Sequence, residues 1–250
     1  MVYVYGITDS AGLLAGPVVA GRDGLNDQPL ESCALETIAA VYSRHVTNAP
    51  IPATPENAWR HERVVEWLMR ERSVLPARFG TTFHDEAKLR AALGPHEREL
   101  SAGLRRLAGC VELGVRVLWE PAPSVASPTA PASVSESVKP PPESGRAYMM
   151  ARLAEERRRR DELERAERII NELHGPLAQL AVDSTRRVLT TPQTLLVAAY
   201  LVPRDRTEPF RRRVEELGAA HPALRVVCTG PWPPYHFVPR LGEPPEVARG

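Results

Sequence analysis

The segment that most restricts the fold lies near the C-terminus, where residues 229–238 read Thr-Gly-Pro-Trp-Pro-Pro-Tyr-His-Phe-Val. Its three prolines fix φ and supply no backbone N–H, so a central strand cannot continue through them. Residues 224–228 alternate and contain β-branched side chains, which predicts a strand that ends at Gly230. We therefore expect a rigid proline corner after the last strand, followed by a short apolar piece.

The aromatic side chains of this corner, Trp232, Tyr235 and Phe237, have two interpretations. Buried aromatic residues mostly serve packing, which favours core positions for all three. The alternative is a surface that binds a partner protein. Pro231 and Pro234 also have the PxxP spacing of polyproline ligands, although this pattern is short and frequent.

Composition is ordinary for a soluble globular protein, with 43% hydrophobic and 25% charged residues among 250. Lys plus Arg number 32 and Asp plus Glu 31, a balance without the basic character typical of nucleic-acid or anionic-membrane binding. No apolar run approaches the roughly 20 residues that cross a bilayer, and the N-terminus lacks a signal-peptide pattern. We expect a cytoplasmic protein.

The sequence contains no motif typical of an active site. GxGxxG, Walker A, HExxH and GxSxG patterns are absent. Cys33, Cys110 and Cys228 are odd in number and far apart, which argues against a disulfide framework or a zinc site. His61 and His84 stand beside acidic residues without metal-ligand spacing, and both are expected on the surface. We expect no catalytic residue, cofactor or metal.

Arg78 is the only charged residue in the apolar run 74–83. Pro76 and Gly80 in this run predict an edge strand or a bulged strand. An arginine in such a strand would hold an internal carboxylate or line a cleft.

Most other segments are assigned by their period and their end signals. Strands are expected at residues 2–7, 18–20, 35–42, 111–119 and 194–202. Helices are expected from Thr54 to near Ser73, after Asp85, and at 207–218. A further short helix is expected to carry Leu100, Leu104 and Leu107 and to end at Gly109. The apolar face of the first helix is expected to begin at Ala58 or Trp59.

Residues 146–189 form the longest region with a helical pattern. Its apolar positions alternate three and four apart, which predicts a coiled-coil-like seam at Leu163, Ala166, Ile170, Leu173, Leu177 and Leu180. Acidic and basic residues four apart indicate that the run Arg157 to Arg160 is a solvated face. Gly175-Pro176 predicts either a hairpin of two helices or one kinked helix.

The Pro/Ala/Ser-rich tract at 120–144 has almost no large apolar group, so we expect a disordered insertion there. A tract that binds a partner is the alternative. Residues 241–250 are expected to form a flexible tail.

Five segments, in this order, resemble the gas vesicle accessory proteins of the GvpL/GvpF family over nearly the whole chain. They are Tyr-Val-Tyr-Gly-Ile at 3–7, Val-Leu-Pro-Ala-Arg-Phe-Gly-Thr at 74–81, Glu-Leu-Gly-Val at 112–115, Gly-Arg-Ala-Tyr at 145–148, and residues 230–238. The Leu-Pro-x-Arg-Phe-Gly and Gly-Pro-Trp-Pro-Pro-Tyr segments are the specific ones.

The resemblance implies an α+β fold of two domains, at 1–107 and 108–240. The second would be a modified ferredoxin-like fold with a long helical, coiled-coil-like segment, and 120–144 would be its variable Pro-rich insertion. It further implies a non-enzymatic role in gas vesicle assembly, by binding the hydrophobic shell protein and other accessory proteins at the vesicle.

The expected partner-binding residues are Trp232, Tyr235, Phe237, Arg78, Ile170 and Leu173. Two other functions stay open. One is a small-molecule-binding or enzymatic ferredoxin-like protein with a cleft near Arg78, and the other is an adaptor with a polyproline ligand.

Overall fold

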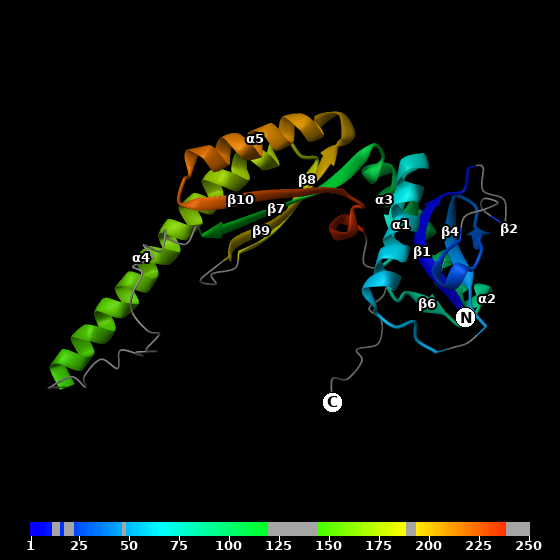
Figure 1. The fold of residues 1–250 in the computed structure, drawn as a ribbon, viewed down its shortest axis with the longest axis horizontal. Coiled ribbons are helices and arrows are strands. Elements are labelled where there is room, and N and C mark those ends of the chain that lie inside the picture. Colours follow the sequence, from blue (N-terminus) through cyan, green and yellow to red (C-terminus); the bar gives the residue numbers. More distant parts are fainter. Residues whose placement is uncertain (12–15, 18–22, 47–48, 120–144, 189–193, 239–250) are drawn as a thin grey trace, which may run out of the picture.

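The chain folds into two antiparallel sheets with helices packed on them (Figure 1). This computed structural model describes residues 1–11, 16–17, 23–46, 49–119, 145–188 and 194–238. The expected strand at 18–20, the insertion at 120–144 and the tail at 241–250 lie outside the described residues. The α+β class expected from the sequence is confirmed.

The first sheet is built around β1 (Val2–Asp9), the expected N-terminal strand. Its order is β2-β3-β4-β1-β5, with β6 also paired to β1. The other strands are β2 (Gly16–Pro17), β3 (Leu30–Ala34), β4 (Ile38–Arg44), β5 (Val74–Pro76) and β6 (Thr82–Phe83). The strand expected within 35–42 is thus confirmed as β4, and the run 74–83 forms two short strands. Gly80 lies between them with φ +86°, which glycine adopts without a Cβ penalty.

Helices cover both faces of the first sheet. α1 (Pro55–Glu71) contacts the face of Tyr3 and Tyr5, while α2 (Glu86–Leu93) and α3 (Glu97–Leu107) contact the face of Val2 and Val4. The expected caps are confirmed, because Thr54 accepts a bond from the Asn57 N–H and Asp85 one from the Lys88 N–H.

The start expected for the apolar face of α1 is wrong. Trp59 is 64% exposed and Ala58 is exposed as well. The buried face begins at His61 and continues through Val64, Val65 and Leu68. Trp59 faces solvent instead, and the guanidinium of Arg63, one turn further along the helix, lies over its ring.

The second sheet has the order β10-β7-β9-β8 and follows the chain order βαββαβ. Its strands are β7 (Cys110–Trp119), β8 (Asp183–Val188), β9 (Thr194–Pro203) and β10 (Leu224–Trp232). α4 (Gly145–Ala178) and α5 (Thr207–Ala220) cover one of its faces (Figure 1). The strands expected at 111–119 and 194–202 and the helix expected from 207 are confirmed.

The helical region expected at 146–189 is wrong in its last part. α4 ends at Ala178, two residues after Pro176, and residues 183–188 form β8 instead. Neither a helical hairpin nor a helix to Leu189 is therefore present. The segment Asp-Ser-Thr-Arg-Arg-Val has little strand pattern of its own, and pairing with β9 along its length makes it a strand.

The three-four spacing on α4 reflects packing on the chain's own sheet. Ala166, Ile170, Leu173 and Leu177 share a core with the inner residues of β7 and β9. A helix that lies on a sheet needs the same apolar stripe as one that pairs with another helix, so the pattern alone did not distinguish them.

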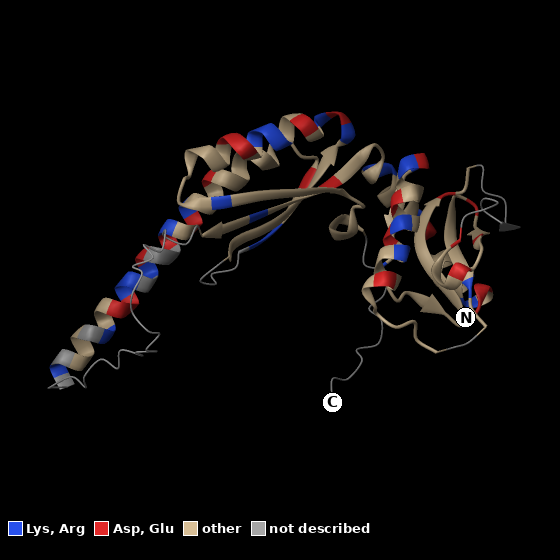
Figure 2. Ribbon diagram, viewed as in Figure 1, with Lys and Arg blue, Asp and Glu red and all other residues tan. Residues whose placement is uncertain are grey.

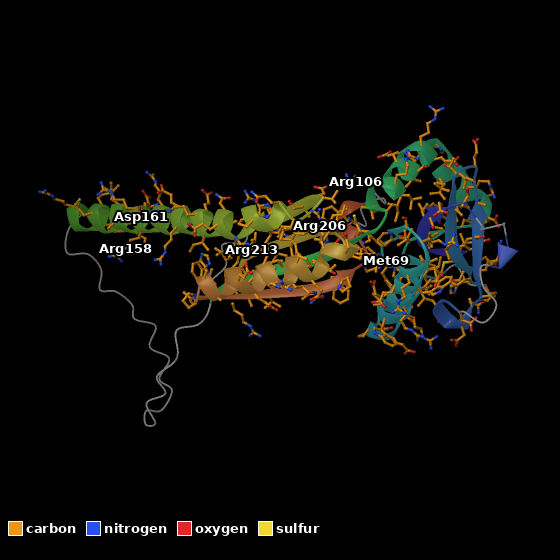
Figure 3. All side chains as sticks on the ribbon, turned by 90° about the horizontal axis from the view of Figure 1, so that it is seen from above. Met69, Arg106, Arg158, Asp161, Arg206 and Arg213 are labelled. Carbon is orange, nitrogen blue, oxygen red and sulfur yellow. The ribbon has the colours of Figure 1, made fainter. Side chains whose placement is uncertain are left out.

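The first part of α4 projects beyond the second sheet (Figures 1 and 3). We call residues 146–165 the free half of α4, because every side chain described in this range is exposed. The solvated face expected here is thus confirmed for Arg157, Arg158 and Arg160, whereas the described ion pair at i, i+4 is Arg152–Glu156.

α3 joins the two sheets through one hydrophobic cluster. Its Leu100, Leu104 and Leu107 are buried against the first sheet and against Leu201 and Phe237 of the second half of the chain. The two sheets therefore share part of their core.

We predict that Leu104→Ala lowers the free energy of unfolding by about 2–5 kcal/mol, because it leaves a cavity in this shared cluster. Denaturant unfolding monitored by circular dichroism measures the change. Arg105→Ala, one residue away and exposed, is the control and should change stability by less than about 0.5 kcal/mol. Equal effects of the two substitutions would contradict a shared core at α3.

Candidate functional site

The proline corner is a bulge in β10 and not the end of the strand. The expected end at Gly230 is wrong, because pairing with β7 shifts register after Thr229 and resumes with Trp232 opposite Glu112. The Gly230–Pro231 peptide bond is cis, and Gly230 has φ +106°. A Cβ at Gly230 would lie 2.7 Å from the Glu112 carbonyl oxygen, so the bulge requires glycine here.

Glu112 holds the residues after the corner. Its side chain is 7% exposed, and Oε2 accepts a bond from the His236 backbone N–H at 3.0 Å. The His236 Nδ1 atom lies 2.7 Å from Oε1 of the same carboxylate. Arg106 of α3 also donates to the Phe237 carbonyl oxygen at 3.1 Å. The corner is thereby tied to both β7 and α3.

Tyr235 connects the corner to α1. Its hydroxyl donates to Glu62 Oε2 at 2.8 Å. Burial raises the pKa of Glu62, and the Tyr235 hydroxyl opposes part of that rise. Burial, together with the neighbouring Glu62 charge, raises the pKa of Tyr235. This bond gives a half-buried carboxylate a donor, and it adds a polar link between the two halves of the chain.

The three corner aromatics therefore have different environments. Phe237 is buried in the shared cluster, as the packing interpretation expected. Tyr235 is half-buried and hydrogen-bonded. Trp232 is 43% exposed, so a core position is wrong for this residue. Pro231 is exposed but Pro234 is buried, which leaves the PxxP pair without a common accessible face.

A buried aromatic cluster around His61 was missed by sequence reasoning. His61 is 2% exposed, so the expectation of a surface histidine is wrong. Its Nε2 donates to the Ala77 carbonyl oxygen at 3.0 Å, and its Nδ1 accepts from the Tyr3 hydroxyl at 3.0 Å. The Tyr3, Tyr5 and Phe79 rings surround it. Burial lowers the pKa of His61 to about 4, so the imidazole is neutral. His61 precedes Val64 by three residues, and this helical spacing was the signal that could have placed His61 on the buried face of α1.

Arg78 lies on the surface beside this cluster. It is exposed, and within the described residues no carboxylate forms an ion pair with it, so the expected internal carboxylate is wrong. Its backbone carbonyl accepts from the Thr81 side chain and closes the turn before β6.

Two hollows are described, and Arg78 lines neither. One, of about 260 Å³, lies between the end of α1 and the start of β7 and includes residues 69–74, Cys110 and Arg204. The other, of about 510 Å³, lies between α3, β8 and residues 236–238. Figure 3 shows Met69 and Arg106 at this junction of the two halves.

The two seam residues expected to bind a partner have no free surface, and Leu163 of the expected seam lies outside the described side chains. Ile170 and Leu173 are each 1% exposed, inside the core of the second sheet. Large exposed apolar side chains gather instead at the tip of the free half, at Tyr148, Met149, Met150 and Leu153. Sequence reasoning did not select them, because their spacing forms no single heptad stripe.

The described residues hold no group of three or more histidine, cysteine, aspartate or glutamate side chains that could bind a metal ion. None of the described helices is both long and apolar enough to cross a bilayer. The three cysteines are free, and Cys33 and Cys110 are buried.

A family model described as gas vesicle synthesis protein GvpL/GvpF matches residues 1–239. The chain belongs to this family. It is 30% identical to gas vesicle protein L of a Streptomyces species, over 94% of this chain and 91% of the relative. It is 29% identical to gas vesicle protein F2 of Halobacterium salinarum, over 95% and 91% of the two chains.

Solved structures with the same fold carry the same family name. The gas vesicle protein GvpF from Anabaena superposes with a TM-score of 0.72 at 24% identity, covering 96% of each chain. GvpF from Microcystis aeruginosa gives a TM-score of 0.70 at 20% identity, covering 96% of this chain and 99% of that one.

The family resemblance inferred from the proline motifs is thereby confirmed. Membership of this family supports a role in gas vesicle assembly.

We predict that Phe237→Ala lowers the free energy of unfolding by about 3–5 kcal/mol and Trp232→Ala by only about 1 kcal/mol. The difference follows from burial, because Phe237 fills the shared cluster while Trp232 is half in solvent. Denaturant titration of both variants gives the comparison, and a larger loss for Trp232→Ala would overturn the assignment of their environments.

His61 should make stability depend on pH. Because its pKa is about 4 when folded and 6.5 in the unfolded chain, its contribution is complete above pH 6.5 and is lost as pH falls toward 4. We expect a loss of up to about 3 kcal/mol over this interval. His61→Gln keeps an amide donor for Ala77 and should show a flatter dependence.

Urea unfolding of both proteins at pH 7, 6 and 5 measures this difference. The other titrating groups are common to both, so parallel curves for wild type and His61→Gln would show that His61 does not supply the pH dependence.

Proposed function

We propose that this chain is a non-enzymatic accessory protein of gas vesicle assembly that binds the hydrophobic shell protein and other accessory proteins. Membership of the GvpL/GvpF family along residues 1–239 supports the role in gas vesicle assembly. The exposed surface of α4 supports binding to another protein as the way in which the chain acts. The proposal places the protein in the cytoplasm and at the gas vesicle.

The observation that carries the proposal is the apolar tip of α4. Four of the eight large hydrophobic side chains that are exposed in the described chain lie here, within residues 148–153. Exposed apolar groups gathered in one place commonly mark a protein-binding surface. The tip projects away from both sheets (Figure 3), so a partner can surround it.

The charged remainder of the free half suits a helix that must stay in solution before it binds. Arg157, Arg158 and Arg160 alternate around the helix with Glu155, Glu156 and Asp161, and all are exposed. Packing contributes little here, so helix stability depends on these residues' propensity and on charge pairs such as Arg152–Glu156. A partner with an apolar groove would bury the tip and leave the charges in water.

The six partner-binding residues expected from the sequence divide by exposure. Trp232 and Arg78 are exposed and Tyr235 is half-buried, so we keep these three as further candidates for partner binding beside the tip of α4. Phe237, Ile170 and Leu173 are buried, and we propose a structural role for these three.

We also propose the division into domains at 1–107 and 108–240, with the second a modified ferredoxin-like fold. The chain order βαββαβ and the sheet order β10-β7-β9-β8 support this assignment. The alternative of a small-molecule cleft at Arg78 gains no support from the described hollows, which lie elsewhere.

The test is capture of the co-expressed shell protein by the purified full chain. We expect Met149→Gln with Leu153→Gln to reduce capture at least tenfold, because both apolar contacts are replaced. The melting temperature should stay within about 2 °C, because both side chains are exposed and glutamine is a good helix former.

The matched control is Arg157→Ala with Glu164→Ala, two exposed polar positions farther along the same helix. Trp232→Ala tests the second surface. Capture that survives the glutamine pair would exclude the α4 tip, and no capture by the wild type would exclude direct contact with the shell protein.

A further inference from the structure

β8 is an edge strand with an open outer side. In the sheet order β10-β7-β9-β8 it pairs with β9, and among the described strands none pairs with its other side. Thr185, Arg186 and Arg187 are exposed, so no described helix covers them. The backbone N–H and C=O groups on such an edge can pair with a further strand.

The residues of β8 carry opposite charges at its two ends. Asp183 begins the strand, and Arg186 and Arg187 lie toward its end (Figure 2). Asp183, Thr185 and Arg187 share one face of the sheet, because side chains alternate along a strand. The other face carries Ser184 and Arg186 and is the side on which α4 packs, since the Arg186 guanidinium donates to Asn171 Oδ1 at 2.9 Å.

This order of charges is complementary to itself in an antiparallel pair. When Thr185 lies opposite Thr185 of a second copy, Asp183 lies opposite Arg187 of that copy, and Arg187 lies opposite its Asp183. Residues directly opposite have Cβ atoms about 4.5–5.5 Å apart, which lets a carboxylate and a guanidinium bond. Ser184 lies opposite Arg186, so no two like charges are directly opposite.

The neighbouring registers lose this match. With the two-fold axis at Arg186, this arginine lies opposite its own copy, and like charges directly opposite are destabilising. With the axis at Ser184, Asp183 lies opposite Thr185 and no ion pair forms between these strands. The axis at Thr185 is therefore the register that the charges favour.

The start of β8 lies beside a hollow in which carboxylates outnumber guanidinium groups. The 510 Å³ hollow between α3 and β8 is lined by Glu99, Asp183 and Arg106, among other residues. Arg106 Nη2 lies 3.5 Å from Asp183 Oδ2 and also donates to the Phe237 carbonyl oxygen. A second guanidinium opposite Asp183 would balance the remaining negative charge.

Arg187 is available for this contact. It is exposed, and it forms no ion pair with any described residue. Asp183 can accept it, because its Oδ1 takes the Ser184 N–H at 2.7 Å and a carboxylate has about four acceptor sites.

An exposed valine adjoins the same edge. Val182, directly before β8, is 56% exposed, and its N–H donates to the Leu201 carbonyl oxygen, which keeps it beside β9. In the register at Thr185 it lies opposite residue 188 of the second copy. Pairing would therefore remove apolar surface from water at each end of the joined strands.

We propose that the protein forms a two-fold symmetric dimer in which the outer edges of two β8 strands pair antiparallel, with Thr185 at the axis. The two four-stranded sheets then join into one, with the helices of both copies on the same face. A strand of another protein is the competing occupant of this edge. A second copy is favoured because a two-fold interface requires a patch that fits itself, as the order Asp183, Thr185, Arg187 does.

This inference goes beyond the proposed function. The proposed contact with the shell protein uses the tip of α4, whereas the dimer uses β8. The substitutions that test the two surfaces are different, so either proposal can fail while the other stands.

The first experiment is sedimentation velocity of the purified full-length protein from about 5 to 300 µM, because so small an interface is typical of weak association. We expect a monomer–dimer equilibrium in the wild type. Arg187→Asp should raise the dissociation constant at least tenfold, because two carboxylates then lie opposite each other. The matched control is Arg212→Asp, the same charge change at an exposed position of α5, which should sediment like the wild type.

A mixture of two variants tests the register. Asp183→Arg should also dimerise at least tenfold more weakly than the wild type, because it places two arginines opposite each other. Mixed with Arg187→Asp it should form a heterodimer, since one copy then has arginine at both positions and the other has aspartate at both. Circular dichroism checks that each variant is folded.

Cross-linking provides a test that leaves the charges in place. Thr185→Cys puts two cysteines directly opposite each other at the axis, so mild oxidation should give a disulfide-linked dimer on a non-reducing gel. Arg212→Cys is the control, because its cysteine is exposed and lies away from the axis. The native cysteines are common to both variants.

A wild type that stays monomeric over the whole concentration range would overturn the proposal. So would a dimer that Arg187→Asp weakens no more than Arg212→Asp does, because another surface or the net charge would then be responsible. If Asp183→Arg does not fold, the cross-link decides, and equal cross-linking of Thr185→Cys and Arg212→Cys would show that β8 is not the interface.

Discussion

Burial of α3 between the two sheets is the interaction on which the rest of the structure depends. An isolated helix of 11 residues is marginal in water, so α3 exists because Leu100, Leu104 and Leu107 are buried. The same cluster receives Leu201 and Phe237 from the second half of the chain. α3 thereby sets where the second sheet lies.

The polar bonds at this junction add specificity to the apolar contact. Glu112 is held by His236, and Glu62 by Tyr235, so two buried or half-buried carboxylates each have a donor. A carboxylate left without a partner there would cost free energy, and this restricts the path of the chain after the proline corner. The junction is thus held together by contacts within the chain. The tip of α4, where four large apolar side chains are exposed, lies away from this junction (Figure 3).

Sequence reasoning succeeded where the signal was local. The cap at Asp85 and the alternating strand β7 follow from residues that are neighbours in the chain. It failed for β8, because the segment becomes a strand only by pairing with β9. It also failed for His61, whose neighbour Glu62 pointed to a surface site although its helical spacing matched the buried face. For the candidate site, the pattern found the arginine and aromatic segments but not which side chains remain exposed.

The sequence by itself determined the helix caps, the strands with strict alternation, the rigid proline segment at the corner and the family, because these depend on local sterics and short motifs. Only the tertiary structure decided which apolar stripes are covered. Ile170 and Leu173 face the chain's own sheet, whereas Trp232 and Met149 face water. The physical reason is that burial depends on the surface that arrives opposite a residue, and this surface comes from segments far away in the chain.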